Sequence, residues 1–120
     1  MKVTAFEDLL AWQKAQDIAV LIYNNFDSLR DYGFRDQICR ASVSISNNIA
    51  EGFERYSKKE FIRFLYISKG SSAEVKSMLY LAKRLNFLEE EKVKNIQELC
   101  EETSRIIRGL IKSLEVNAIK

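Results

Sequence analysis

Polar and charged side chains recur every third or fourth residue between residues 37 and 55. This polar stripe runs through Gln37, Arg40, Ser44, Asn48, Glu51 and Arg55. Together with Glu74 it offers carboxylates and arginine, a combination that can serve acid–base catalysis. The stripe lies about 100° around the predicted helix from its core face, beside the core rather than opposite it. That position favours a structural role over catalysis. We expect a buried or interfacial hydrogen-bonded network that fixes helix register or a subunit contact, formed by Arg40, Ser44, Asn48, Glu51 and Glu74.

A second set of side chains, between residues 55 and 83, could bind nucleic acid. Cations and tyrosines share one broad face of a predicted helix, roughly opposite its core face: Lys59, Arg63, Tyr66, Lys69, Lys76, Tyr80 and Lys83. Arg55 and Lys58 extend this basic face at the preceding corner. Cations neutralise phosphates, and interleaved aromatic rings such as Tyr66 and Tyr80 stack on unpaired bases. The alternative is an ordinary solvated face, since lysine is common on exposed helices.

The residues on which most enzymes and metal sites depend are missing from the sequence. The chain has no histidine, the commonest general base and metal ligand. Cys39 and Cys100 lie far apart, and each falls in an apolar pattern, so we expect two buried thiols in a reducing cytosol. No glycine-rich phosphate loop or nucleophile elbow occurs. We therefore expect no enzymatic activity, no cofactor, no metal and no small-molecule substrate.

Length and composition predict one domain that spans residues 1–120. The apolar share of 47% is ordinary for a globular protein. The net charge is only +2, but residues 35–84 hold ten Lys and Arg against five Asp and Glu. The first residues lack the apolar segment of a signal peptide, and no apolar run approaches the ~20 residues of a membrane span. We expect a cytoplasmic protein that makes no membrane contact.

The chain contains no proline, which is typical of few, long, uninterrupted helices. Apolar residues recur with a helical period in four segments, which predict helices at about residues 5–26, 34–56, 58–85 and 89–115. Four helices of this length joined by short loops form an up-down-up-down bundle. The expected fold class is therefore an all-α four-helix bundle.

Local signals predict where the helices begin. The segments TAFE at residues 4–7 and SKKE at residues 57–60 both fit a capping box. Tyr56 and Phe61 are spaced as a hydrophobic staple around the second of these starts.

Three residues with special backbone preferences carry further expectations. Gly33 suits a positive φ at the end of a first loop over residues 27–33. Gly70, in mid-helix, indicates a close backbone contact, because glycine there costs about 1 kcal/mol against alanine. Asn86 suits a left-handed cap at the end of the third helix.

Large aliphatic side chains also lie away from the core faces of the first and last helices. They are Leu9, Leu10, Val20 and Leu21 in the first helix, and Leu99 and Ile106 in the last. A surface helix of a monomer rarely carries so many flanking aliphatics, so we expect a second buried face and a homo-oligomer.

The middle of the chain resembles a known family of small bacterial four-helix-bundle proteins, which are encoded in intervening sequences of 23S rRNA genes. The resemblance covers about residues 6–114. It rests on Leu10, Trp12, Arg40-Ala41, Ser44-Ile45, Asn48 to Gly52, Arg55, Ser57, Phe64-Leu65, Gly70-Ser71 and Glu74. The chain departs from the family pattern in two places: it lacks a proline near Asp27, and Ser68 replaces an alanine.

The resemblance implies a cytoplasmic, ring-shaped homopentamer with no known catalytic activity. A related branch, the accessory protein of diversity-generating retroelements, is a basic pentameric barrel that binds nucleic acid and its reverse transcriptase. We therefore expect a homo-oligomer that binds RNA or DNA mainly through phosphates. The alternative is a structural or adaptor ring whose partner is another protein.

Overall fold

A computed structural model describes residues 3–119, with side chains described up to residue 116. These residues form one short 3-10 helix and four α-helices. The elements are η1 (Phe6–Asp8), α1 (Leu10–Phe26), α2 (Tyr32–Phe53), α3 (Lys58–Arg84) and α4 (Glu90–Ile119). No strand occurs within residues 3–119, and the predicted all-α class is confirmed.

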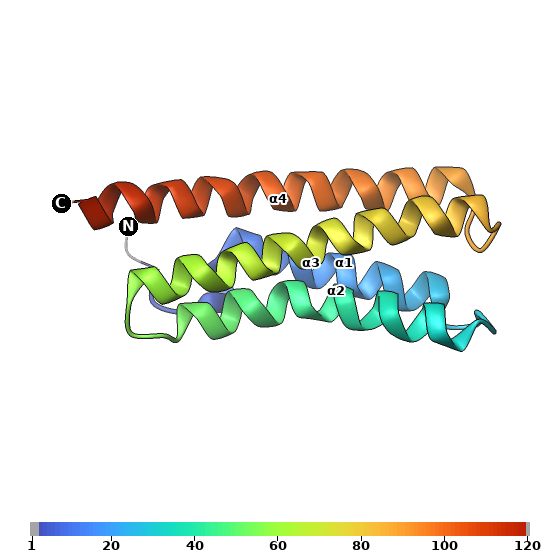
Figure 1. Cartoon of the computed structure of the whole chain (residues 1–120), viewed down its shortest axis with the longest axis horizontal. Helices are drawn as coiled ribbons and strands as arrows, with labels where there is room; N and C mark the ends of the chain where they lie inside the picture. The colour runs from blue at the N-terminus through green and yellow to red at the C-terminus, as the bar shows by residue number, and fades with distance from the viewer. Residues whose placement is uncertain (1–2, 120) are drawn as a thin grey trace.

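The four α-helices run alternately up and down the long axis of the molecule (Figure 1). Each helix packs against two neighbours, so that α1 contacts α2, α2 contacts α3, α3 contacts α4 and α4 contacts α1. The bundle measures 50 × 20 × 20 Å. Its centre is filled by large apolar side chains from all four helices, among them Ile18, Phe26, Ile45, Leu65, Leu79, Ile96 and Ile107. The helical period of apolar residues therefore predicts the core faces.

The predicted start of the first helix at residue 5 is wrong. Phe6–Asp8 form a separate 3-10 turn, and α1 begins at Leu10. Neither start has a side-chain cap, so the capping box between Thr4 and Glu7 does not form. Instead, the Gln13 amide donates a hydrogen bond to the Glu7 carbonyl oxygen at 2.9 Å. This bond ties the short turn to α1.

The connection between α1 and α2 is shorter than the sequence predicts. Asp31 is the N-cap of α2, and its carboxylate accepts a hydrogen bond from the Phe34 N–H at 3.1 Å. Gly33 therefore lies in the first turn of α2 and has no positive φ, so its predicted role in the loop is wrong. Aspartate is a strong N-cap, and its position starts the helix earlier.

The corner between α2 and α3 is capped as predicted but packed by a different residue. The Ser57 hydroxyl accepts a hydrogen bond from the Glu60 N–H at 3.1 Å, which confirms the cap. Helix α2 ends earlier than predicted, and Tyr56 is fully exposed. The staple of Tyr56 on Phe61 is therefore wrong. The Phe53 ring occupies that place, with its centroid 5.8 Å from that of Phe61.

Close helix packing requires a glycine in α2 rather than at the predicted site in α3. A Cβ at Gly52 would lie 2.6 Å from the Cβ of Phe64, so any side chain there would push α2 and α3 apart. A Cβ at Gly70 would have no heavy atom within 4 Å. The close contact predicted at Gly70 is therefore wrong for the single chain.

The end of α3 follows the prediction. Asn86 has a φ of 60°, in the left-handed region. Its N–H donates to the Lys83 carbonyl oxygen at 3.1 Å, and the Phe87 N–H donates to the Ala82 carbonyl oxygen at 2.8 Å. These two bonds form a Schellman motif, which satisfies the last carbonyls of the helix. The sharp reversal places α4 along α3.

The core face of α4 rotates toward its end. A seven-residue apolar pattern that begins at Val93 and Ile96 predicts that Leu110 and Leu114 lie in the core. Ile107 and Ile111 are buried, whereas Leu110 and Leu114 are half-buried. A straight helix with 3.6 residues per turn drifts away from a seven-residue pattern. This drift explains the change of register.

Candidate nucleic-acid interface

The polar stripe does not form one network within the chain. The Asn48 amide donates to the carbonyl and hydroxyl oxygens of Ser44, both at 2.8 Å. The Ser44 hydroxyl lies 2.9 Å from the Ser71 hydroxyl on α3. On the surface, the Gln37 amide donates to the Glu74 carboxylate at 3.3 Å. The structure therefore brings Ser44 and Asn48 together but leaves Glu74 apart.

The two charged residues of the stripe on α2 also lie apart from this cluster. Glu51 pairs with Arg55 one turn later, at 2.8 Å, and both side chains are about half exposed. Arg40 is exposed and forms no ion pair with a described residue. Arg40 and Glu51 instead line an open hollow of about 700 Å³ beside Tyr23 of α1.

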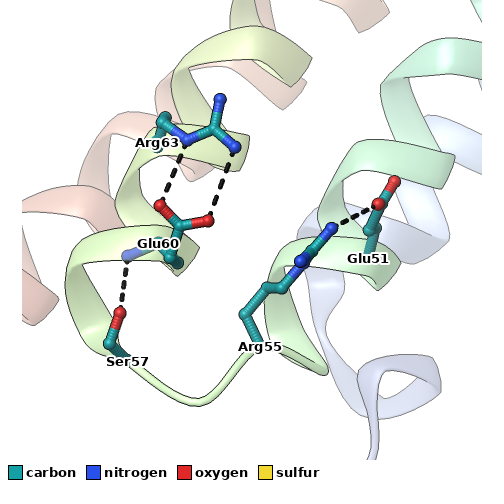
Figure 2. A network of polar contacts seen from close by, with 5 residues as sticks. All are labelled: Glu51, Arg55, Ser57, Glu60 and Arg63. Carbon is teal, nitrogen blue, oxygen red and sulfur yellow. Dashed lines mark hydrogen bonds and ion pairs between the residues drawn. The ribbon is translucent and has the colours of Figure 1, made fainter.

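Arg55 and Arg63, both predicted to bind phosphates, stabilise the corner between α2 and α3 (Figure 2). Arg55 pairs with Glu51, and Arg63 donates two hydrogen bonds to Glu60, at 3.2 and 3.4 Å. The hydrogen bond from Arg63 lowers the pKa of the Glu60 carboxyl. Both guanidinium groups also lie over the Phe64 ring, 4.9 and 4.8 Å from its centroid. These contacts compete with phosphate binding.

Two lysines of the basic face pair with carboxylates of α4. The Lys76 ammonium lies 3.0 Å from the Glu101 carboxylate, and the Lys83 ammonium lies 3.4 Å from that of Glu90. The hydrogen bond to Glu101 raises the pKa of Lys76. The charges of Lys76 and Lys83 are therefore partly compensated within the chain.

The remaining members of the basic face have no such partner. Lys58, Lys59 and Lys69 form no ion pair with another residue in the described part of the chain. Tyr66 and Tyr80 are 51% and 56% exposed on α3. The cations without an ion-pair partner among the described residues therefore lie at two places on α3. Lys58 and Lys59 lie at its exposed start, and Lys69 lies in its middle.

Beside Lys69 lies a row of cations on α4 that is not among the predicted phosphate-binding residues. Arg105, Arg108 and Lys112 are exposed. Two adjoining hollows of about 290 and 530 Å³ lie between α3 and α4, and both are lined by Lys69, Arg105 and Arg108. Tyr66 and Lys112 line the larger hollow. We refer to the two hollows and these five side chains as the α3–α4 groove.

The cations of the α3–α4 groove have no ion-pair partner among the side chains that the structure describes. Lys69, Arg105, Arg108 and Lys112 make no ion pair with any residue up to 116. The sequence contains a signal for this row, because positions 105, 108 and 112 share one helix face. The packing of α4 against α3 brings this face beside Lys69.

Other kinds of site have less support among the described residues. They include no group of three or more potential metal ligands, and none of their helices is long and apolar enough to cross a membrane. Both cysteines are free thiols. Cys100 is buried, and burial raises its pKa to about 11. Cys39 is half-buried rather than buried as predicted, and burial raises its pKa as well.

The fold is a small four-helix bundle, and the α3–α4 groove places cations between its last two helices. The family model described as 23S rRNA-intervening sequence protein matches residues 7–109. The chain belongs to this family, which confirms the resemblance found in its sequence.

A solved structure supports the same conclusion at the level of the fold. The chain is similar to a crystal structure of a protein with unknown function from the S23 ribosomal protein family of Bacteroides thetaiotaomicron. The two are 25% identical with a TM-score of 0.80, and the match covers 86% of this chain and 99% of the other. No curated protein sequence matches the chain.

Proposed function

We propose that this chain is a non-enzymatic, homo-oligomeric helical bundle that binds RNA or DNA mainly through phosphates. The observation that carries the proposal is the α3–α4 groove, where four cations converge without an ion-pair partner among residues 3–116. Arg55, Arg63, Lys76 and Lys83 are paired with carboxylates, so the groove is the better place for a polyanion. Each phosphate neutralised there releases counterions, which favours binding at low salt.

Self-association is supported by apolar side chains that the chain itself leaves exposed. Leu10, Val20 and Leu21 on α1 are 51%, 56% and 37% exposed, whereas Leu9 turns into the core. Leu99 and Ile106 on α4 are half-buried against their own core, so the expected second face lies mainly on α1. The resemblance to the family implies a pentamer, and a ring would multiply the groove into a belt of positive charge.

A cytoplasmic location is part of the same proposal. Both thiols are free, as is usual in a reducing compartment. Nucleic acid is also abundant there.

Fluorescence anisotropy with a labelled single-stranded RNA, from about 50 mM salt upward, tests the proposal. The groove variant combines Arg105→Gln with Arg108→Gln. The matched control combines Arg84→Gln with Lys94→Gln, which removes two exposed cations that neither line the groove nor form an ion pair with a described residue. Circular dichroism and light scattering check that both variants keep their helicity and mass.

We expect the affinity of the wild type to fall linearly on a log–log salt plot. The groove variant should lose about 1.4 units of slope, about 0.7 for each single-strand phosphate contact removed, while the control keeps the slope. Equal losses in both variants would place binding outside the groove. Absence of binding at low salt would reject the function and favour the adaptor that binds a protein partner.

A further inference from the structure

We infer that the α3–α4 groove binds a single strand rather than a duplex, and that each subunit takes a short segment with one base stacked on Tyr66. This inference rests on the proposed function, because it concerns the same groove. To that function it adds the class of nucleic acid, which is a single strand, and the residue that selects this class, which is Tyr66. Three features of the groove support it: the length of its cation row, the charges at its two ends and the position of one aromatic ring.

The cation row on α4 matches a short stretch of one strand. Arg105 and Lys112 are seven residues apart in the sequence, which corresponds to about 10 Å along the helix axis at ~1.5 Å per residue. Arg108 lies between them, and Lys69 faces the same hollows from α3. Successive phosphates of one stacked strand are ~3.4 Å apart along the axis, so the row spans about three phosphate spacings.

Carboxylates mark both ends of the groove. Glu101 lines the smaller hollow, where it is paired with Lys76. Glu115 lines the larger hollow beside Lys112. A phosphate that extended past Glu115 would meet a like charge, and one that extended past the pair of Lys76 and Glu101 would find both charges already compensated. The favourable track within one subunit is therefore short, and a longer strand must pass to another subunit or into solvent.

Tyr66 gives the groove a means to distinguish unpaired from paired bases. Its side chain is 51% exposed and lines the same hollow as Lys69 and Lys112. An exposed aromatic ring next to a phosphate track stacks on a base that is free to turn toward it. In a duplex, the faces of the bases are already stacked on one another. A duplex can therefore use the cations but not the ring.

The shape of the groove favours the same ligand. The two hollows between α3 and α4 hold about 290 and 530 Å³. A single flexible strand can enter a trough of this size. A rigid duplex contacts only the rim, where fewer of the four cations reach its phosphates.

The test compares a labelled RNA of about 12 nucleotides, within the range of single-strand site sizes, with a duplex of the same sequence. Wild type, Tyr66→Leu and Tyr66→Phe are measured at one low salt concentration. The control variant is Tyr32→Leu, which removes a tyrosine that is 60% exposed on α2, far from the groove residues in sequence and absent from its lining. Helicity and mass are checked for each variant.

We expect wild type to bind the single strand at least about tenfold more tightly than the duplex. Tyr66→Leu should weaken single-strand binding by about five- to 150-fold and leave duplex binding unchanged. Tyr66→Phe, which keeps the ring, and Tyr32→Leu should bind as wild type does.

Two results would overturn this inference. One is compatible with the proposed function, and the other rejects that function as well. Equal affinity for strand and duplex, with no effect of Tyr66→Leu, rejects the stacking site. If the pair Arg105→Gln and Arg108→Gln still weakens binding in that case, phosphate binding in the groove survives. If wild type binds neither ligand, the inference and the proposed function both fail. The strand-to-duplex ratio of the wild type needs no variant, so a misfolded Tyr66→Leu protein does not block the test.

Discussion

At the scale of single residues, the partner of a cation decides whether it is available to a phosphate. The pairs of Arg55 with Glu51 and of Arg63 with Glu60 are spaced i,i+4 and i,i+3, so they could be predicted from the sequence. The pair of Lys76 with Glu101 joins two helices, and no local pattern indicates it. Residue type and period therefore place the basic face but do not show which of its charges are compensated.

The alkaline stability of the protein should depend on Cys100. Its thiol ordinarily loses its proton near pH 9.0, and in the folded chain only near pH 11, because burial penalises the thiolate. Above pH 9 the unfolded state therefore binds fewer protons, and the free energy of unfolding falls as pH rises toward 11. For a shift of this size the loss is on the order of 2–3 kcal/mol.

Urea unfolding of wild type and Cys100→Ala, from about pH 8 upward, measures this contribution. The variant lacks the thiol, so the difference in unfolding free energy between the two proteins should shrink as pH rises from 9 to 11. The comparison cancels the titration of lysines and tyrosines, which the two proteins share. Parallel pH profiles would show that Cys100 ionises as freely in the folded chain as in the unfolded one.

At the scale of helices, sequence signals predicted the core faces and some of the ends. Ser57 caps the start of α3 and Asn86 ends it, as predicted. Each lies next to a strong apolar pattern, which allows only one position for the helix to begin or end. The Thr4 cap failed, since the chain forms a separate 3-10 turn before α1. The prediction for Gly33 is wrong because the Asp31 cap starts α2 before this glycine. Such competition between caps is decided by tertiary packing, which local patterns do not contain.

Substitution of alanine for a glycine should have opposite effects on stability at Gly52 in α2 and at Gly70 in α3. Gly52→Ala places a Cβ 2.6 Å from that of Phe64, so α2 and α3 must move apart at a cost of about 1–3 kcal/mol. Gly70→Ala places its Cβ in open space and should stabilise α3 by up to about 1 kcal/mol, through the higher helix propensity of alanine. Thermal unfolding measures both. A stable Gly52→Ala protein would show that the helices are less closely packed at this corner.

At the scale of the whole molecule, the groove was missed although its parts were visible. Arg105, Arg108 and Lys112 follow a helical spacing in the sequence. Residues 85–120, however, hold six Lys and Arg against seven Asp and Glu, so the net charge of a segment points to residues 35–84 instead. Only the packing of α4 against α3 brings this row beside Lys69 and Tyr66. Net charge over a segment thus hides a local row of cations on one helix face.

Self-association should be visible in the mass of the protein in solution. Light scattering at micromolar concentration should give a multiple of 14.0 kDa, five-fold if the resemblance to the family extends to assembly. Val20→Glu should lower that mass without loss of helicity, because Val20 is 56% exposed in the single chain. A wild-type mass near 14.0 kDa would contradict self-association. A dimer or tetramer would reject only the pentamer.

The central claim, that nucleic acid lies in the α3–α4 groove, is tested most directly by photo-crosslinking to a thiouridine-substituted single-stranded RNA. Mass spectrometry of the crosslinked peptides identifies the residues in contact with the bases. We predict crosslinks within residues 66–76 of α3 and residues 105–112 of α4, and loss of these crosslinks as salt is raised. Crosslinks confined to α1, or to the corner around Arg55 and Lys58, would contradict the account.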